Sequence, residues 1–193
     1  MSTKFTILGC GSSVGVPRAD GFTGNCNMTN KKNYRTRCSA LIKFNNQNFL
    51  IDTSPDLKSQ LLNNKVKSLE KVFYTHPHAD QTHGINDLRA FYLITKKQIP
   101  VFADKQTSEY LKSTFNYCFK STNEYPSTLI LNKLKRKHLF KNNNYKILIE
   151  AIPIEHGKIK SICYLINKKL AYASDISLFY KKDYKKLMKL DYL

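Results

Sequence analysis

Three of the five histidines of this chain lie within eight residues, in the segment from Tyr74 to Gly84. At the chain's own histidine frequency, a window of that size would hold about 0.2. His76 and His78 alternate, and in an extended loop residues two apart face the same way, so both imidazoles can reach one ion. Asp80 continues the spacing, whereas His83 alone is an ambiguous ligand. Because imidazole and carboxylate are the ligands of zinc and related metals, the segment predicts a metal site rather than solvated or structurally hydrogen-bonded histidines.

The sequence around the histidines predicts their place in the fold. Residues Leu69–Thr75 include the β-branched and aromatic side chains of a buried strand, and Pro77 ends it. From Gly84 onwards, apolar residues recur at helical spacing. The histidines therefore occupy a strand-to-helix loop, which is where layered α/β folds carry their chemistry.

The segment from His76 to Gln81 resembles the His-x-His-x-Asp-His signature of the metallo-β-lactamase superfamily, although Gln81 stands where the family has histidine. Within the superfamily, the closer resemblance is to small proteins related to phosphoribosyl cyclic phosphodiesterase. The stretches that carry it are Leu8–Ser13, Gly15–Pro17, Gly24–Cys26, Arg35–Ser39 and Gly84–Arg89. The resemblance extends from Met1 to about Asp175.

The resemblance implies further site residues, each after a hydrophobic strand. His156 matches the family's single histidine at a strand end, and Asp175 matches the aspartate that bridges two metals. Asp52 matches the aspartate that buttresses the metal loop. With His76 and His78, His156 would bind one ion through three nitrogens and leave an open position for water.

A second ion would lie beside Asp80 and Gln81, with Asp175 as the bridge. An amide is a poor substitute for imidazole, so this second ion is expected to bind weakly or not at all. His83 is an additional candidate ligand. Zinc is the expected cofactor, as one or two ions, with manganese or iron as alternatives.

The resemblance implies a mixed α/β (α+β) fold, the αββα sandwich of the superfamily, in a single domain over residues 1–193. The pattern of the sequence fits two sheets packed face to face with helices outside. Strands are expected at Lys4–Leu8, Ser39–Phe44, Asn48–Asp52, Lys71–Thr75, Val101–Ala103, Tyr145–Ile154, Ser161–Ile166 and Leu170–Ser174. Helices are expected at Pro55–Asn63, Asn86–Thr95, Ser108–Phe119 and Tyr180–Leu190.

The end of the chain is expected to leave the sandwich incomplete. Relatives continue past the residue equivalent to Leu193 with a strand, a helix and another strand, and supply a last histidine to the second metal. The chain is then either a fragment of a longer enzyme or a minimal protein that works with one metal. Either way, an uncovered sheet edge predicts self-association.

Composition limits the setting of the protein. No apolar run approaches the roughly twenty residues of a membrane span, and the start of the chain has the pattern of a strand rather than a signal peptide. The five cysteines are odd in number and lack a Cys-x-x-Cys pair, which favours free thiols in a reducing compartment. We therefore expect a cytoplasmic protein without a membrane partner. An auxiliary zinc at Cys26 and Cys38 is the less favoured alternative.

The net charge of +18 favours an anionic partner, either a small phosphoester or nucleic acid. The lysines are scattered, however, and only residues 133–141 form a basic cluster, so a solvated surface is the alternative. Arginine is scarce, and its guanidinium forms a bidentate fork for phosphate. Arg35, Arg37 and Arg89 are therefore candidate substrate contacts, with ion pairing inside the fold as an equal alternative.

The expected function is that of a metal-dependent hydrolase, most of all a phosphodiesterase, including one for cyclic phosphate esters. The metal would lower the pKa of its bound water from 15.7 towards about 7 and so supply a hydroxide nucleophile. Asp80 would orient that water or accept its proton. The alternatives are a thioester or lactone hydrolase, an RNA-processing nuclease, or a non-catalytic, nucleic-acid-binding protein on a degenerate scaffold.

Overall fold

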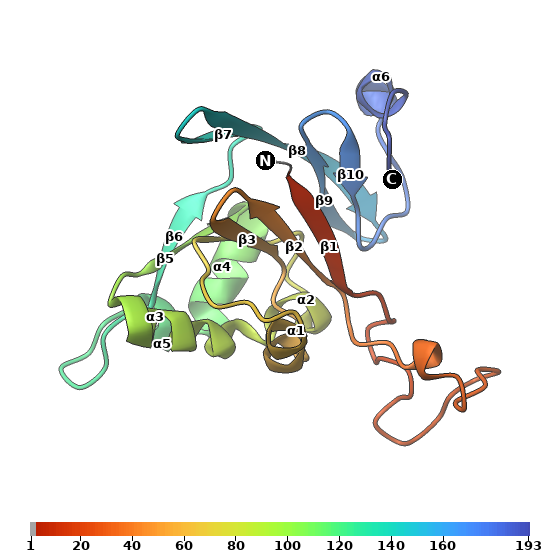
Figure 1. Ribbon diagram of the computed structural model, residues 1–193, viewed down its shortest axis with the longest axis horizontal. Coiled ribbons are helices and arrows are strands. Elements are labelled where there is room, and N and C mark those ends of the chain that lie inside the picture. Colours follow the sequence, from red (N-terminus) through yellow and green to blue (C-terminus); the bar gives the residue numbers. More distant parts are fainter. Residues whose placement is uncertain (1–2) are drawn as a thin grey trace.

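Two β-sheets form the centre of the computed structural model, which describes residues 3–193 (Figure 1). The first sheet has six strands, in the order β1 (Lys4–Gly9), β2 (Ser39–Phe44), β3 (Gln47–Ile51), β4 (Lys71–Phe73), β5 (Ile99–Ala103) and β6 (Leu129–Lys133). The second has four, in the order β10 (Leu170–Tyr172), β9 (Ile159–Ile166), β8 (Tyr145–His156) and β7 (Lys137–Asn142). Strands β3 to β6 are parallel, and all other pairings are antiparallel.

Short helices cover the outer face of the first sheet. These are α1 (Leu57–Asn63), α2 (Ala79–Thr82), α3 (Arg89–Thr95), α4 (Lys105–Thr114) and α5 (Asn116–Phe119), with the 3-10 helix η2 (Ile85–Leu88) between α2 and α3. The 3-10 helix η1 (Lys31–Asn33) lies in the β1–β2 connection, and η3 (Lys181–Asp183) and α6 (Tyr184–Leu187) lie beside the second sheet. Among the described residues, no helix is long and apolar enough to cross a membrane.

Three apolar clusters fill the spaces between these layers. The first joins the helices to the first sheet and includes Leu57, Val72 and Leu111. The second lies between the two sheets, and the third joins the second sheet to the C-terminal segment. This layering confirms the αββα sandwich predicted from the sequence. It also explains why both faces of β4 are apolar: successive side chains point to opposite faces, so Val72 and Phe73 face different clusters.

The structure corrects the sequence prediction in three segments. The basic cluster at 133–141 is part of two strands, β6 and β7, in which exposed Lys137 and Lys141 alternate with the inward-facing His138. The helix expected at Tyr180–Leu190 is shorter and divided, with the 3-10 helix η3 followed directly by the single turn α6. The helix expected at Ser108–Phe119 begins earlier, at Lys105, because the Asp104 side chain caps it by accepting a hydrogen bond from the Thr107 amide, and it breaks into α4 and α5.

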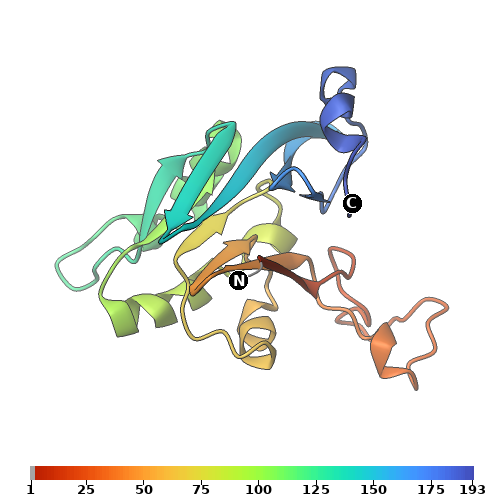
Figure 2. The ribbon, with the colours of Figure 1, turned by 45° about the horizontal axis from the view of Figure 1, so that its top comes forward.

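The long connection between β1 and β2, residues 10–38, projects away from the sandwich (Figures 1 and 2). The two ends of the connection are joined at its base by the Gly11 amide, which donates to the Thr36 carbonyl at 2.7 Å. The histidines and the buttressing aspartate expected from the sequence lie elsewhere, at the carboxyl ends of β3, β4 and β8.

Candidate metal centre

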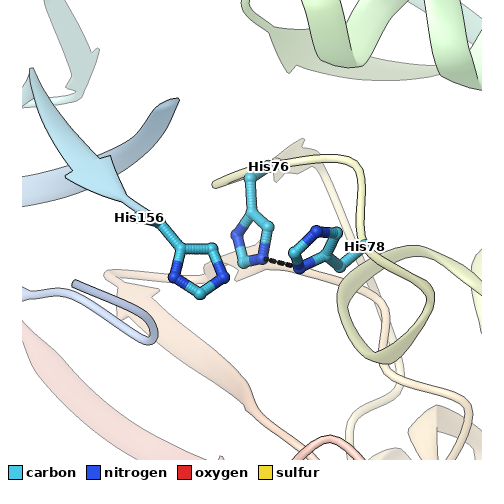
Figure 3. Close-up of side chains that lie close together, drawn as sticks. All are labelled: His76, His78 and His156. Carbon is cyan, nitrogen blue, oxygen red and sulfur yellow. Dashed lines mark hydrogen bonds between the residues drawn. The ribbon is translucent and has the colours of Figure 1, made fainter. Parts of the chain in front are cut away.

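Three histidines from two sheets converge at the end of the sandwich. His76 and His78 follow β4 of the first sheet, and His156 is the last residue of β8 in the second (Figure 3). One ligand nitrogen from each lies within 4.8 Å of the other two. His76 Nε2 and His78 Nδ1 are 3.2 Å apart. Within residues 3–193, no other group of three or more histidine, cysteine or acidic side chains comes together in this way.

A relay of hydrogen bonds orients His76. The carboxylate of buried Asp52 accepts from the Thr75 amide at 2.7 Å and from Thr75 Oγ1 at 2.8 Å. Because Thr75 Oγ1 donates its only proton to Asp52, it must accept a hydrogen bond from His76 Nδ1, 3.0 Å away. This places the imidazole proton on Nδ1 and leaves the Nε2 lone pair for the site, as in other carboxylate-supported metal ligands. Ser161 Oγ of β9 also lies 3.3 Å from Nδ1.

Burial keeps His76 neutral. Desolvation, followed by the charges of His78 and His156, lowers the pKa of His76 to about 4, against an opposing effect of Asp80. Burial likewise raises the pKa of Asp52 well above its usual value, although the hydrogen bonds from Thr75 oppose the shift. A neutral imidazole is the form that binds a metal.

Two further polar side chains adjoin the histidines. Asp175 Oδ2 lies 3.8 Å from His76 Nε2 and accepts a hydrogen bond from Gln81 Nε2 at 3.1 Å. Gln81 is fully buried in α2, and half-buried Asp80 precedes it in the same helical turn. The three nitrogens, with His76 held neutral and a carboxylate at their edge, fit a nitrogen-binding transition metal.

The Beta-lactamase superfamily domain profile matches residues 47–193, a range that includes every side chain of the site described above. The chain belongs to the metallo-β-lactamase superfamily. It is 30% identical over 171 residues to an octanoyltransferase of Porphyromonas gingivalis (strain ATCC BAA-308 / W83), a match that covers 88% of this chain and 34% of that protein. The chain therefore spans about a third of the length of this curated relative.

Two solved structures of the superfamily fold show the same architecture. A diphosphatase from the PhnP family is 26% identical, with a TM-score of 0.83, over 98% of this chain and 72% of that one. The Zn²⁺-bound PqqB from Methylobacterium extorquens is 14% identical, with a TM-score of 0.71, over 98% of this chain and 71% of that one. The resemblance to metal-dependent hydrolases of this superfamily is thereby confirmed for family and fold.

The structure does not bring every candidate of the sequence analysis to the superfamily's metal position. His83 is exposed and packs edge-on against Phe115, with ring centroids 5.4 Å apart, because α2 turns its side chain away from the other histidines. Cys26 is an exposed free thiol on the projecting segment. The remaining histidine, His138, is buried between the sheets, where its Nε2 accepts from the Lys135 amide at 3.0 Å.

The three candidate arginines have different partners. Arg37 forms a bidentate pair with Asp56, with contacts of 2.8 and 2.7 Å, which lowers the pKa of that carboxyl. Arg89 lies 4.1 Å from the ring centroid of Tyr125. The Arg37 pair fits the ion-pairing alternative, whereas the Arg89 contact is a cation–π contact. Arg35 is exposed and donates to Cys10 Sγ at 3.2 Å, so it retains donors for a ligand.

Contacts to the β3 end hold the metal loop, and sequence reasoning had not identified them. The Thr53 amide donates to the Gln81 carbonyl at 2.7 Å, and the Gly84 amide donates to the Thr53 carbonyl at 2.9 Å. Gly84 lies so close to this strand that a Cβ atom would come within 2.0 Å of the Ser54 carbonyl oxygen. The glycine after the histidine motif was the available signal.

We expect Gly84→Ala to lower the free energy of unfolding by about 1–3 kcal/mol, because the added methyl must push the metal loop off the backbone at Ser54. Urea denaturation measures the loss. Asn86→Ala, at an exposed position two residues later, is the control and should leave stability within about 0.5 kcal/mol. Equal stabilities of the two variants would contradict the close approach.

Proposed function

We propose that the chain is a metal-dependent hydrolase of phosphodiesters, including cyclic phosphate esters. The observation that carries this proposal is the convergence of His76, His78 and His156 around one point. A divalent ion held there supplies Lewis acidity, which activates water and polarises a phosphoryl oxygen. Zinc is the proposed ion because the ligands are nitrogens, with manganese or iron as alternatives.

The protein's own groups have defined parts in such a reaction. The Asp52–Thr75 relay holds His76 in one tautomer and one orientation. Asp80, in the first turn of α2, has a half-buried carboxylate whose charge acts on His76. We assign to Asp80 the orientation of the attacking water and the acceptance of its proton.

Two observations support a phosphate ester as substrate. The relative of known structure with 26% identity is described as a diphosphatase. The net charge of +18 attracts anions, and exposed Arg35, which donates to Cys10 Sγ, retains further donors for a ligand. Arg35 is therefore the proposed contact to the phosphate, whereas Arg37 and Arg89 are not part of this proposal.

The test is hydrolysis of bis(p-nitrophenyl) phosphate and of a 2′,3′-cyclic nucleotide by the purified chain, before and after removal of metal with a chelator. We expect turnover that the chelator abolishes and that zinc or manganese restores. Turnover that is indifferent to the chelator, or none with either ion, would overturn the proposal. Binding of random oligonucleotides with a steep salt dependence but no turnover would favour the non-catalytic alternative.

A second candidate is hydrolysis of an acyl thioester. It is supported by the curated relative, described as an octanoyltransferase, and by an open apolar groove between the edge strands β1 and β10. The groove is lined by Phe5, Ile7 and Tyr172 and extends to Ser174, next to Asp175. Octanoyl and acetyl thioesters of one small thiol distinguish the candidates, since groove binding predicts faster hydrolysis of the longer chain. A preference for phosphodiesters over both would exclude this candidate.

A further inference from the structure

Two of the five cysteines are neighbours across the strand pair at the base of the projecting segment. The residue before Cys10 pairs with Ser39 in the ladder of β1 and β2, and the residue after Cys10 forms a β-bridge with Arg37. Cys38 lies between Arg37 and Ser39, so the pairing on either side brings it next to Cys10. Cβ atoms that face each other across antiparallel strands are about 4.5–5.5 Å apart. A disulfide needs Cβ atoms about 3.5–4.5 Å apart, so a small movement can join the two sulfurs.

Both cysteine side chains face the same space. Each lines the groove between β1 and β10, which Tyr172 also lines. Burial, followed by nearby charges that include those of both sulfurs, raises the pKa of Tyr172 well above its usual value. Cys38 Sγ donates to the Gly11 carbonyl oxygen at 3.5 Å, so it points at the residue that follows Cys10. The two thiols therefore lie on one side of the strand pair.

The two thiols have different surroundings. Cys10 is exposed, and Arg35 Nη1 donates a hydrogen bond to its sulfur at 3.2 Å. Exposure and an adjacent cation are typical of reactive cysteines. Cys38 is half-buried, and burial, followed by the charges of Asp175 and Asp52, raises its pKa to about 12. An oxidant in solvent therefore meets Cys10 first, while Cys38 stays a thiol beside it.

We propose that Cys10 and Cys38 form a reversible disulfide when the chain meets a hydroperoxide such as hydrogen peroxide. Cys10 Sγ attacks the peroxide, an S–O bond forms as the O–O bond breaks, and the thiol proton leaves with the released hydroxide as water. Cys38 Sγ then attacks the Cys10 sulfenic acid, the S–S bond forms as the S–O bond breaks, and a second water carries away the Cys38 proton. The two thiols lose two electrons in total, and these reduce one hydrogen peroxide to two waters.

The disulfide would join the two ends of the projecting segment covalently, where the hydrogen bond from Gly11 to Thr36 already holds them together. The groove that both cysteines line reaches Ser174, next to Asp175, so the modification lies on the groove that leads to the candidate metal centre. No step of the reaction uses a metal or a phosphoester. The inference therefore stands or fails independently of the proposed hydrolase function.

The other cysteines provide a sharp test of the native geometry. Cys118 and Cys163 are buried in apolar clusters and out of reach of an oxidant in solvent. Cys26 is exposed on the projecting segment, 16 positions from Cys10 and 12 from Cys38, whereas Cys10 and Cys38 are 28 positions apart. An unfolded chain favours the shorter loops, so pairing of the two most distant of these three cysteines requires the fold.

The experiment treats the reduced full chain with one equivalent of hydrogen peroxide, blocks the remaining thiols with N-ethylmaleimide in denaturant and maps tryptic peptides by mass spectrometry. Cys10, Cys26 and Cys38 fall on separate peptides, namely Phe5–Arg18, Ala19–Lys31 and Cys38–Lys43. We expect the first and third peptides to be linked, three of the five thiols to remain, and dithiothreitol to restore all five. The same treatment in urea should link Cys26 instead.

Two variants assign the roles of the sulfurs. Cys38→Ser should leave a sulfenic acid on Cys10 that dimedone traps, because the second thiol is missing. Cys26→Ser is the matched control and should form the link to the same extent as wild type. Five unmodified thiols in the native chain, a native link to Cys26, or a link between two chains on a non-reducing gel would each overturn the proposal.

Discussion

His156→Ala is expected to lose the bound zinc and to reduce turnover of a phosphodiester by on the order of a thousand-fold. His156 supplies one of three nitrogens, and it is the one that the second sheet contributes. Its loss leaves only the paired His76 and His78, and two nitrogens from one loop do not enclose an ion. Elemental analysis and kcat, measured on the same preparation, test both effects.

The fold is expected to survive this substitution. His156 is half-buried at the last position of β8, and the apolar clusters on either side of the second sheet do not include it. His83→Ala is the matched control, since that histidine lies in the same loop but packs against Phe115. Retained zinc and full turnover in His156→Ala would exclude the three-histidine centre. An equal loss in His83→Ala would show that the loop, rather than the ligand, is responsible.

The local part of the candidate site can be read from the sequence alone. His76, His78, Asp80 and Gln81 are close in the chain, so one strand-to-helix loop must bring them together. His156 came from the resemblance, because it ends a strand of the second sheet and meets His76 and His78 only through the packing of the two sheets against each other. The Asp52–Thr75 relay likewise spans 23 positions, and only the parallel pairing of β3 with β4 aligns its ends.

Contacts between residues far apart in the chain could not be read from the sequence. Arginine scarcity indicated Arg37 and Arg89 as phosphate contacts, which stays a prediction; their partners in the fold, Asp56 and Tyr125, are 19 and 36 positions away, and nothing local marks them. Strand β7 was read as a charge cluster because its outward side carries Lys137 and Lys141, with exposed Leu139 between them. Its inward residues, His138 and Phe140, form part of the aromatic packing between the sheets.

Phe73→Ala is expected to lower the free energy of unfolding by about 3–5 kcal/mol. Phe73 is the last residue of β4 and is 0% exposed between the two sheets. It stacks on Phe102 at 4.9 Å between centroids and meets Tyr164 edge-on at 5.6 Å. Its neighbours are rigid rings on strands of both sheets, so they cannot collapse into the space that the ring leaves. Urea denaturation at a fixed chelator concentration measures the loss.

The chelator separates packing from metal binding. Zinc stabilises any variant that binds it only when folded, by an amount that depends on its concentration, and would mask part of the effect of Phe73→Ala. Phe22→Ala is the control, since that ring is 60% exposed on the projecting segment and should cost less than about 0.5 kcal/mol. A loss below about 1 kcal/mol for Phe73→Ala would show that the sheets do not depend on this aromatic contact. Because Phe73 is three residues before His76, a large loss would show that the packing between the sheets also holds the strand that carries the metal ligands.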